Sequence, residues 1–157
     1  MTSRRLCAAA VAVPLLAVAA ALFTQYRLDM QPCPWCVLQR VIFVAIALAA
    51  LPGLLAGGRV ARWFSGPLVA VLTLCGIATA LWQHFVASSS TSCALTLADR
   101  FNRGLGLDEM LPQVFASYAS CAEAKASLLG VPYEFYSLTL FVALAAVAAL
   151  LLRGHRG

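Results

Sequence analysis

Charged side chains are scarce in this sequence. They make up 11% of its 157 residues, whereas 62% of the residues are hydrophobic. An ordinary soluble domain carries about 25% charged residues, so this chain has too few charges to cover a water-soluble globule. Most of it must therefore be surrounded by lipid. Its length suits a single domain over residues 1–157.

The sequence also lacks the motifs of several functional classes. It contains no nucleotide, metal or flavin motif and no internal repeat. The net charge of +5 would suit a nucleic acid, but the basic residues are scattered and form no patch, so we expect no nucleic-acid partner. We interpret these residues instead as signals of membrane topology.

Long apolar stretches are the main feature that is present. Each is close to the roughly 20 residues that cross a bilayer as a helix, and together they predict an all-α membrane protein, an antiparallel bundle of four transmembrane helices. The first stretch follows Arg4 and Arg5, as a cleaved signal peptide would. It is longer than the roughly 7–15 apolar residues of such peptides, so we favour a retained helix. The four stretches are residues 6–24, 37–56, 66–87 and 135–152.

The positive charges indicate an orientation for this bundle. Six basic residues flank the termini and the middle connection, and the acidic residues all fall in the other two loops. By the positive-inside rule both termini are cytoplasmic, and the loops 26–35 and 88–134 face outward, into a bacterial periplasm. The six basic residues are Arg4, Arg5, Arg59, Arg62, Arg153 and Arg156.

Four of the six cysteines lie in or beside the outward loops. The first loop leads into Cys33 and Cys36, and the second holds Cys93 and Cys121. An outward compartment of this kind is oxidising, so disulfides can form and persist there. Cys7 and Cys75 fall inside apolar stretches, where we expect them to pack as small apolar residues between helices.

The motif Cys33-Pro34-Trp35-Cys36 stands where the second apolar stretch begins. Cysteines three positions apart lie close together at the start of a helix, so a disulfide between them can open and close. The positive end of the helix dipole would favour the Cys36 thiolate, and Arg40 one turn further on would add a full charge. Alternatively, Arg40 snorkels to the membrane interface.

The same residues could also have structural or transport roles instead of a redox role. The first cysteine pair would suit half of a zinc site, although such sites usually combine two short-spaced pairs and Cys93 and Cys121 are far apart in sequence. Those two cysteines could equally form a purely structural disulfide. A small transport subunit fits less well, because Arg40 and His84 alone would make a poor relay through the apolar stretches.

A run with helical periodicity crosses the second outward loop. Apolar side chains recur there at positions 107, 110, 111, 114, 115 and 118, with polar ones between them. This pattern predicts a short amphipathic helix that lies on the outer leaflet or against the bundle. Pro112 would kink this helix or mark its first turn.

Over nearly its whole length the chain resembles the DsbB family of membrane proteins. Gln39 departs from those members that carry Glu before the arginine. The resemblance rests on the four apolar stretches, on Cys33-Pro34-Trp35-Cys36 followed by Gln39-Arg40, on the separated Cys93 and Cys121, and on the segments Leu111-Pro112-Gln113-Val114-Phe115, Cys121-Ala122-Glu123 and Leu129-Gly130.

The resemblance implies a thiol:quinone oxidoreductase of the bacterial inner membrane. A periplasmic DsbA-like oxidase with a thioredoxin fold would attack a Cys93–Cys121 disulfide, first at Cys93. The freed Cys121 would then engage Cys33 and leave Cys36 as a thiolate. Cys36 would donate to a bound quinone, which would leave as quinol for the respiratory chain.

The resemblance also places the quinone, either ubiquinone or menaquinone, near Arg40 and His84. For His84 the alternative is a plain role at the carboxyl end of a helix, where an imidazolium suits the helix dipole. For the whole chain the alternative is a non-catalytic membrane scaffold whose two outer-loop disulfides are structural.

Overall fold

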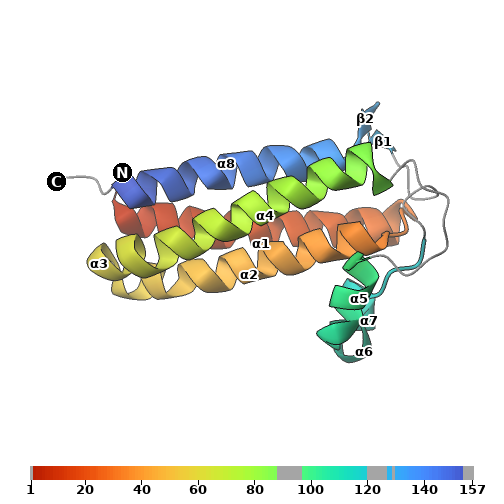
Figure 1. The fold of residues 1–157 in the computed structure, drawn as a ribbon, viewed down its shortest axis with the longest axis horizontal. Coiled ribbons are helices and arrows are strands. Elements are labelled where there is room, and N and C mark those ends of the chain that lie inside the picture. The colour runs from red at the N-terminus through yellow and green to blue at the C-terminus, as the bar shows by residue number, and fades with distance from the viewer. Residues whose placement is uncertain (1, 88–96, 120–126, 129, 154–157) are drawn as a thin grey trace.

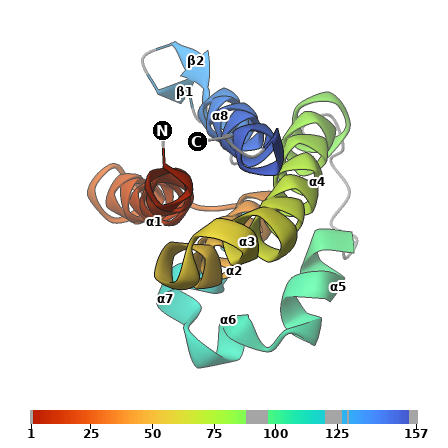
Figure 2. The same cartoon turned by 90° about the vertical axis from the view of Figure 1, so that its left-hand side faces the viewer.

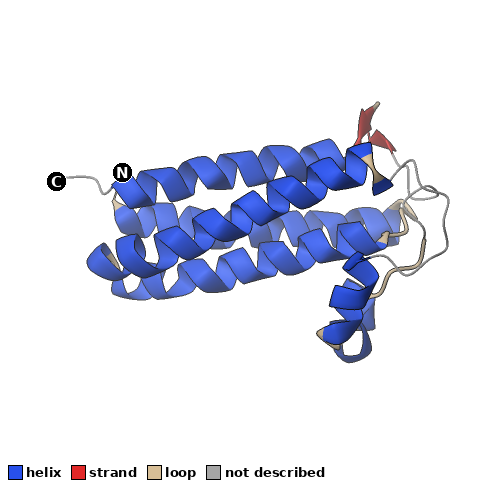
Figure 3. Cartoon of the chain, viewed as in Figure 1, coloured by secondary structure: helices blue, strands red, loops and turns tan. Residues whose placement is uncertain are grey.

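Four long helices make up most of the protein. The computed structural model describes residues 2–87, 97–119, 127–128 and 130–153. In it the helices α1 (Ser3–Arg27), α2 (Pro34–Ala56), α4 (Gly66–Phe85) and α8 (Tyr133–Arg153) lie side by side as a bundle (Figures 1 and 3). This confirms the predicted four-helix membrane fold.

The helices α1, α2 and α8 cover the whole of their predicted apolar stretches, whereas α4 ends at Phe85, before the predicted end at residue 87. The helix α2 begins at Pro34, three positions before the predicted apolar stretch, because Cys33 takes the N-cap and proline suits the first helical position. It ends where Gly57 adopts a φ of 67°, and the short helix α3 (Gly58–Val60) follows. The π-helical turn η1 (Ala61–Ser65) then joins α3 to α4, so that the helical run continues from Gly58 to Phe85.

The bundle is apolar inside and outside. Its core includes Ile46, Phe141 and Leu144, none more than 1% exposed. Large side chains such as Leu48 and Leu74 point away from the core and are 64% and 62% exposed. The four helices are long and apolar enough to cross a membrane. Lipid is the environment that suits such an outer surface, so the chain is a multi-pass membrane protein.

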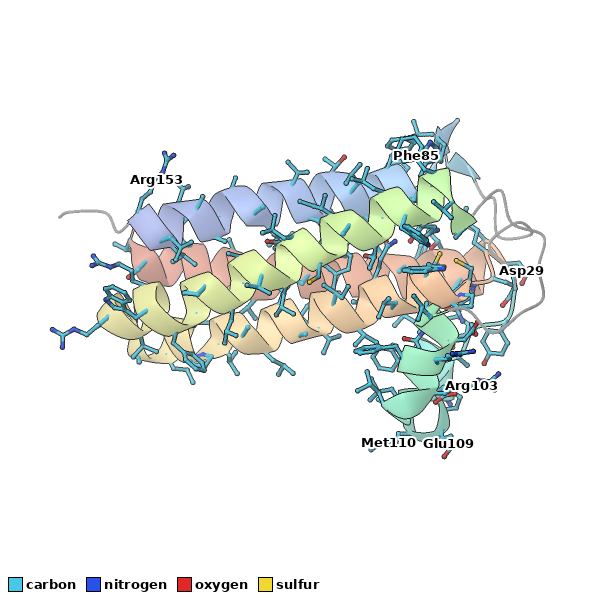
Figure 4. All side chains as sticks on the ribbon, in the orientation of Figure 1. Asp29, Phe85, Arg103, Glu109, Met110 and Arg153 are labelled. Atoms are coloured by element: carbon cyan, nitrogen blue, oxygen red, sulfur yellow. The ribbon has the colours of Figure 1, made fainter. Side chains whose placement is uncertain are left out.

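The two ends of the bundle differ in character (Figure 1). At one, the termini end, the start of α1 and the end of α8 lie near α3 (Figure 1), and Arg153 marks this end in Figure 4. There Arg4 Nη2 donates to the Leu55 carbonyl at 2.9 Å and satisfies one of the last carbonyls of α2. At the other, the loop end, α1 and α4 end and α2 and α8 begin, and Asp29 and Phe85 mark this end in Figure 4.

The connection between α4 and α8 builds an arm beside the loop end. It consists of α5 (Leu97–Gly104), α6 (Leu107–Met110) and α7 (Pro112–Phe115), which project from one side of the bundle (Figure 2). Pro112 divides the predicted amphipathic segment into two short helices, since it disfavours the helical conformation at Leu111, whose φ and ψ are −136° and 66°. The helix α5 was not predicted.

A short antiparallel hairpin leads into α8. Its strands are β1 (Ser127–Leu128) and β2 (Val131–Pro132), and Ser127 pairs with Pro132. Gly130 lies between them with a φ of 82°, a conformation that glycine adopts without strain. The hairpin fixes where α8 starts, which places Tyr133 and Glu134 at the loop end.

Candidate redox site

Cys33 and Cys36 lie together at the start of α2. Their Sγ atoms are 3.1 Å apart, so a disulfide bond needs only a small approach of the two sulfurs. The Cys36 N–H donates to Cys33 Sγ at 3.4 Å, which makes Cys33 the side-chain cap of the helix. Cys33 is fully buried, whereas Cys36 is half-buried. A thiol in this first turn faces the positive end of the helix dipole, as the spacing predicts.

The cysteine motif is clamped by the arm. Trp35 is 8% exposed and packs with Cys33 against Ala98 of α5. Asn102 of α5 donates from Nδ2 to the Pro34 carbonyl at 3.0 Å. These contacts tie the loop that contains Cys93 to the helix that carries the first cysteine pair. Cys93 and Cys121 themselves lie outside the described residues.

Two glutamines form a hydrogen-bonded chain that ends at the sulfur of Cys36. Gln83 on α4 donates from Nε2 to Cys36 Sγ at 3.3 Å. Gln39 on α2 donates from its own Nε2 to Gln83 Oε1 at 2.8 Å. Both side chains are buried, 3% and 7% exposed for Gln39 and Gln83. Buried amides in lipid need such partners, so the pair also links α2 to α4.

Arg40 is buried one turn beyond Cys36, at 6% exposure. Its Nη1 donates to Gln25 Oε1 at 2.7 Å and to the Val114 carbonyl at 2.9 Å. Its Nη2 donates to the Ala21 carbonyl at 3.4 Å. Within the described part of the chain it forms no ion pair with a carboxylate. The guanidinium is therefore held by α1 and α7, and it does not snorkel outward.

A cavity of about 220 Å³ opens between the four helices at the loop end. Cys36, Arg40, Gln39 and Gln83 contribute polar atoms to its wall. The rest of the wall is mostly apolar or aromatic and comes from α1, α2, α8 and the connection between α1 and α2. These residues include Ala17, Ala20, Ala21, Phe43, Tyr133, Tyr136 and Leu140. The cavity can hold a small, mostly apolar molecule with hydrogen-bond acceptors, beside Cys36.

His84 lies next to this cavity and is linked to it through Glu134, one of the lining residues. Its Nδ1 is 2.9 Å from Oε1 of Glu134, an ion pair when the imidazole is protonated. Glu134 lines the cavity, whereas His84 is not among the lining residues that the structure describes. The His84 ring also packs edge-on against Phe135 with centroids 4.7 Å apart. His84 thus joins the end of α4 to the start of α8.

The two remaining cysteines lie away from the site. Cys7 is buried beside Gly53, as expected for a small apolar residue between helices. The same expectation for Cys75 is wrong, because Cys75 is exposed on the outer surface of α4. The residue faces lipid there, since the inner face of α4 is already filled by its packing against α2 and α8.

Comparison with known proteins places the chain among related sequences. A family model described as disulfide bond formation protein DsbB matches residues 3–151. The chain belongs to the DsbB family. This membership indicates a role in disulfide bond formation, with a thiol oxidoreductase chemistry that agrees with two adjacent cysteines at a helix start.

Similar proteins cover most of this DsbB-family chain. Disulfide bond formation protein B of Pseudomonas syringae pv. tomato is 33% identical over 141 residues, 88% of this chain and 83% of that protein. The protein of the same name from Aromatoleum aromaticum is 30% identical over 141 residues, with coverage of 87% and 84%. Disulfide bond formation protein B 1 of Pseudomonas aeruginosa is 32% identical over 127 residues, with coverage of 78% and 78%.

Sequence reasoning missed several polar residues around the DsbB-family site. Gln25, Gln83, Asn102 and Glu134 were not singled out, although each now bonds to a predicted site residue or to the cysteine motif. A glutamine inside an apolar stretch is costly in lipid, so Gln83 did carry a signal. The partner of such a residue depends on how neighbouring helices are rotated, which the sequence does not show.

Proposed function

We propose that this protein is a thiol:quinone oxidoreductase that reoxidises a periplasmic DsbA-like dithiol oxidase. Electrons from that thioredoxin-fold partner pass through two cysteine pairs to a membrane quinone. Ubiquinone and menaquinone share the chemistry that the site requires, a flat ring with two carbonyl acceptors. The quinol formed returns the electrons to the respiratory chain.

The observation that carries the proposal is the position of Cys36 in the cavity wall. Cys36 lines a mostly apolar space between membrane helices, which a lipid-soluble molecule can enter. Arg40, Gln39 and Gln83 bring N–H groups to the same space, which suits the carbonyl oxygens of a quinone. A quinone bound there supplies a two-electron acceptor. The residues of the cavity bind and orient it and exclude bulk water.

The thiol chemistry proceeds by exchange between disulfides. The thiolate of the partner attacks Cys93, a partner–Cys93 bond forms, and the Cys93–Cys121 bond breaks with its electron pair on Cys121. The second thiol of the partner then attacks the partner sulfur that is bonded to Cys93, which completes the partner's disulfide and breaks the partner–Cys93 bond with its electron pair on Cys93. Two electrons have then moved from the partner into this chain.

The second exchange moves these electrons to the cavity. Cys121 attacks Cys33, a Cys33–Cys121 bond forms, and the Cys33–Cys36 bond breaks with its electron pair on Cys36. Cys93 then attacks Cys121, the Cys93–Cys121 bond re-forms, and the Cys33–Cys121 bond breaks with its electron pair on Cys33, which takes up a proton. The Cys33–Cys36 dithiol gives up two electrons and two protons to the acceptor when its own disulfide re-forms.

Arg40 and His84 have different parts in this proposal. Arg40 lines the cavity and contributes a fixed positive charge near Cys36, which favours the thiolate and binds an acceptor oxygen. His84 does not line the cavity itself but bonds to Glu134, which does, so His84 would orient the Glu134 carboxylate at the edge of the cavity. Its influence on the bound acceptor is therefore indirect.

The arrangement of charges supports a location in the bacterial inner membrane with both termini cytoplasmic. Arg4, Arg59, Arg62 and Arg153 belong to helices that begin or end at the termini end (Figure 1). The loop end carries Cys33, Cys36 and the arm, and by the positive-inside rule it faces the periplasm. The single domain over residues 1–157 would then present all its exchange chemistry on the oxidising side.

Quinol formation tests this function. Purified protein, a reduced DsbA-like oxidase and quinone are mixed, and the quinone absorbance is followed for the wild type, Cys36→Ser and Cys75→Ser. We expect Cys36→Ser to abolish quinol formation, because it removes the sulfur that faces the cavity. Cys75→Ser makes the same chemical change on the lipid-facing surface and should keep wild-type rates.

Two results would contradict the proposal. One is a wild-type protein that binds the reduced partner but forms no quinol, which is the behaviour expected of a non-catalytic scaffold with structural disulfides. The other is Cys36→Ser with an unchanged rate, which would move the redox chemistry to other residues.

A further inference from the structure

The Cys36 sulfur receives one hydrogen bond from a side-chain amide. This donor is Gln83 Nε2, at 3.3 Å. Arg40 lies close by, but the hydrogen bonds that it donates in the described structure go to Gln25 and to two main-chain carbonyls. Among the described residues, the N–H group that reaches the sulfur from outside its own helix therefore belongs to Gln83.

A second glutamine fixes the direction of this amide. Gln39 Nε2 donates to Gln83 Oε1 at 2.8 Å. While that bond holds the oxygen, the NH₂ group of Gln83 is the end that faces Cys36. Gln39 and Gln83 are 3% and 7% exposed, so water does not compete for these bonds. The two amides therefore form a chain in which Gln39 donates to Gln83 and Gln83 donates to the sulfur of Cys36.

We propose that Gln83 is a catalytic residue that stabilises the Cys36 thiolate, and that Gln39 is the positioning residue that orients it. This inference rests on the proposed function and deepens it. When the Cys33–Cys36 bond breaks during exchange, its electron pair leaves on Cys36. The Gln83 N–H then donates to a sulfur that has just become negative, where hydrogen bonds are stronger than to a neutral thiol. A neutral amide gives this help without adding a charge to the cavity.

The same two glutamines could instead serve only to hold α2 against α4. An interhelical clamp of that kind would affect the stability of the bundle but leave the chemistry of Cys36 unchanged. The two roles are separated by the reactivity of the Cys36 thiol itself. Stability and reactivity are therefore measured on the same samples.

The test measures alkylation of Cys36 in the full-length reduced protein, without quinone or partner. Iodoacetamide is added over a range of pH, and mass spectrometry gives the rate at Cys36, with Cys75 as an internal reference. The variants are Gln83→Met, Gln39→Met and the double variant, because methionine keeps the length of glutamine but donates no hydrogen bond. Rates are compared where they still rise with pH and the thiolate is the minority form.

We expect Gln83→Met to slow alkylation of Cys36 by about threefold to tenfold. The thiolate population falls when a hydrogen bond to a charged atom is lost, and part of this loss is offset because the remaining thiolate is more nucleophilic. Gln39→Met should slow it by roughly twofold to threefold, because the amide of Gln83 is then free to turn. The double variant should be no slower than Gln83→Met, since Gln39 acts through Gln83.

Thr73→Val is the matched control, because it removes a buried polar group of α4 outside the cavity lining. It should leave the Cys36 rate unchanged. The proposal is overturned by an unchanged rate in Gln83→Met, or by a double variant whose effect is the product of the two single ones. Should Gln83→Met fail to fold, Gln39→Met decides alone, and an unchanged rate there overturns the proposal. Since no quinone is present, this test and the quinol assay can fail separately.

Discussion

Arg40 is a buried charge whose surroundings explain how the bundle tolerates it. A guanidinium in a membrane helix is costly unless its donors are satisfied. Here three hydrogen bonds to Gln25, Val114 and Ala21 hold it, and two of the acceptors are main-chain carbonyls. The carbonyls neutralise none of the charge. The positive charge of Arg40 therefore remains uncompensated by these partners and acts on the cavity that Arg40 lines.

Replacing this charge should weaken binding of the acceptor more than it slows turnover. For Arg40→Met we expect the KM for quinone to rise by roughly tenfold, the loss of one charged hydrogen bond, with a smaller change in kcat. Steady-state quinol formation over a range of quinone concentrations measures both constants. The control is Arg27→Met, which removes an exposed arginine of the loop end that does not line the cavity. An unchanged KM in Arg40→Met would exclude Arg40 from acceptor binding.

At the scale of helices, α4 and α8 meet through a glycine and an aromatic pair. A Cβ atom on Gly76 would collide with the ring of Phe141. Phe141 in turn stacks on Phe43 of α2, with centroids 4.2 Å apart and planes at 5°. Gly76 thus allows α4 to approach closely enough for one aromatic ring to bridge three helices. Close approach over small residues is typical of helix packing in lipid.

Gly76→Ala should destabilise the bundle at a position that does not itself line the cavity. The added methyl group cannot fit unless Phe141 moves, and such overpacking costs about 1–3 kcal/mol. The melting temperature of the purified protein in detergent should therefore fall by several degrees. Gly104→Ala is the matched control, since a Cβ there meets nothing within 4 Å. Equal melting temperatures for the two variants would show that the α4–α8 contact is not tightly packed.

At the scale of the whole molecule, the sequence predicted what depends on length and polarity. The apolar stretches predicted four helices, because a lipid-facing segment must be both long and apolar. Cys33 and Cys36 could be placed at a helix start because the second apolar stretch begins directly after them. These features are local, so the residues themselves decide them.

What the sequence did not predict depends on contacts between distant elements. The helix α5 escaped notice because its packing surface is short and holds Asn102, whose partner is the Pro34 carbonyl on another helix. Gln83 reaches Cys36 only through the rotation of α4 against α2. The amphipathic segment was predicted as one helix, and the structure divides it at Leu111, with Pro112 in the first turn of α7.

The orientation of the bundle in the membrane is the property on which its exchange chemistry depends. The start of α1, the end of α8 and α3 lie at one end, and the arm and first cysteine pair lie at the other (Figure 1). We test it with Leu105→Cys on the arm and Val60→Cys in α3, two exposed positions, each in a chain whose native cysteines are replaced by serine. A membrane-impermeant maleimide added to intact cells in which only the outer membrane is permeable should label Leu105→Cys.

Val60→Cys should react only after the inner membrane is lysed, because the positive-inside rule places the arginines beside it in the cytoplasm. The reverse pattern would put Cys33 and Cys36 on the reducing side. Their disulfide would not persist there, and the proposed oxidase would have no partner to oxidise. Equal labelling at both positions would mean a mixed orientation, which the distribution of basic residues between the two ends does not allow.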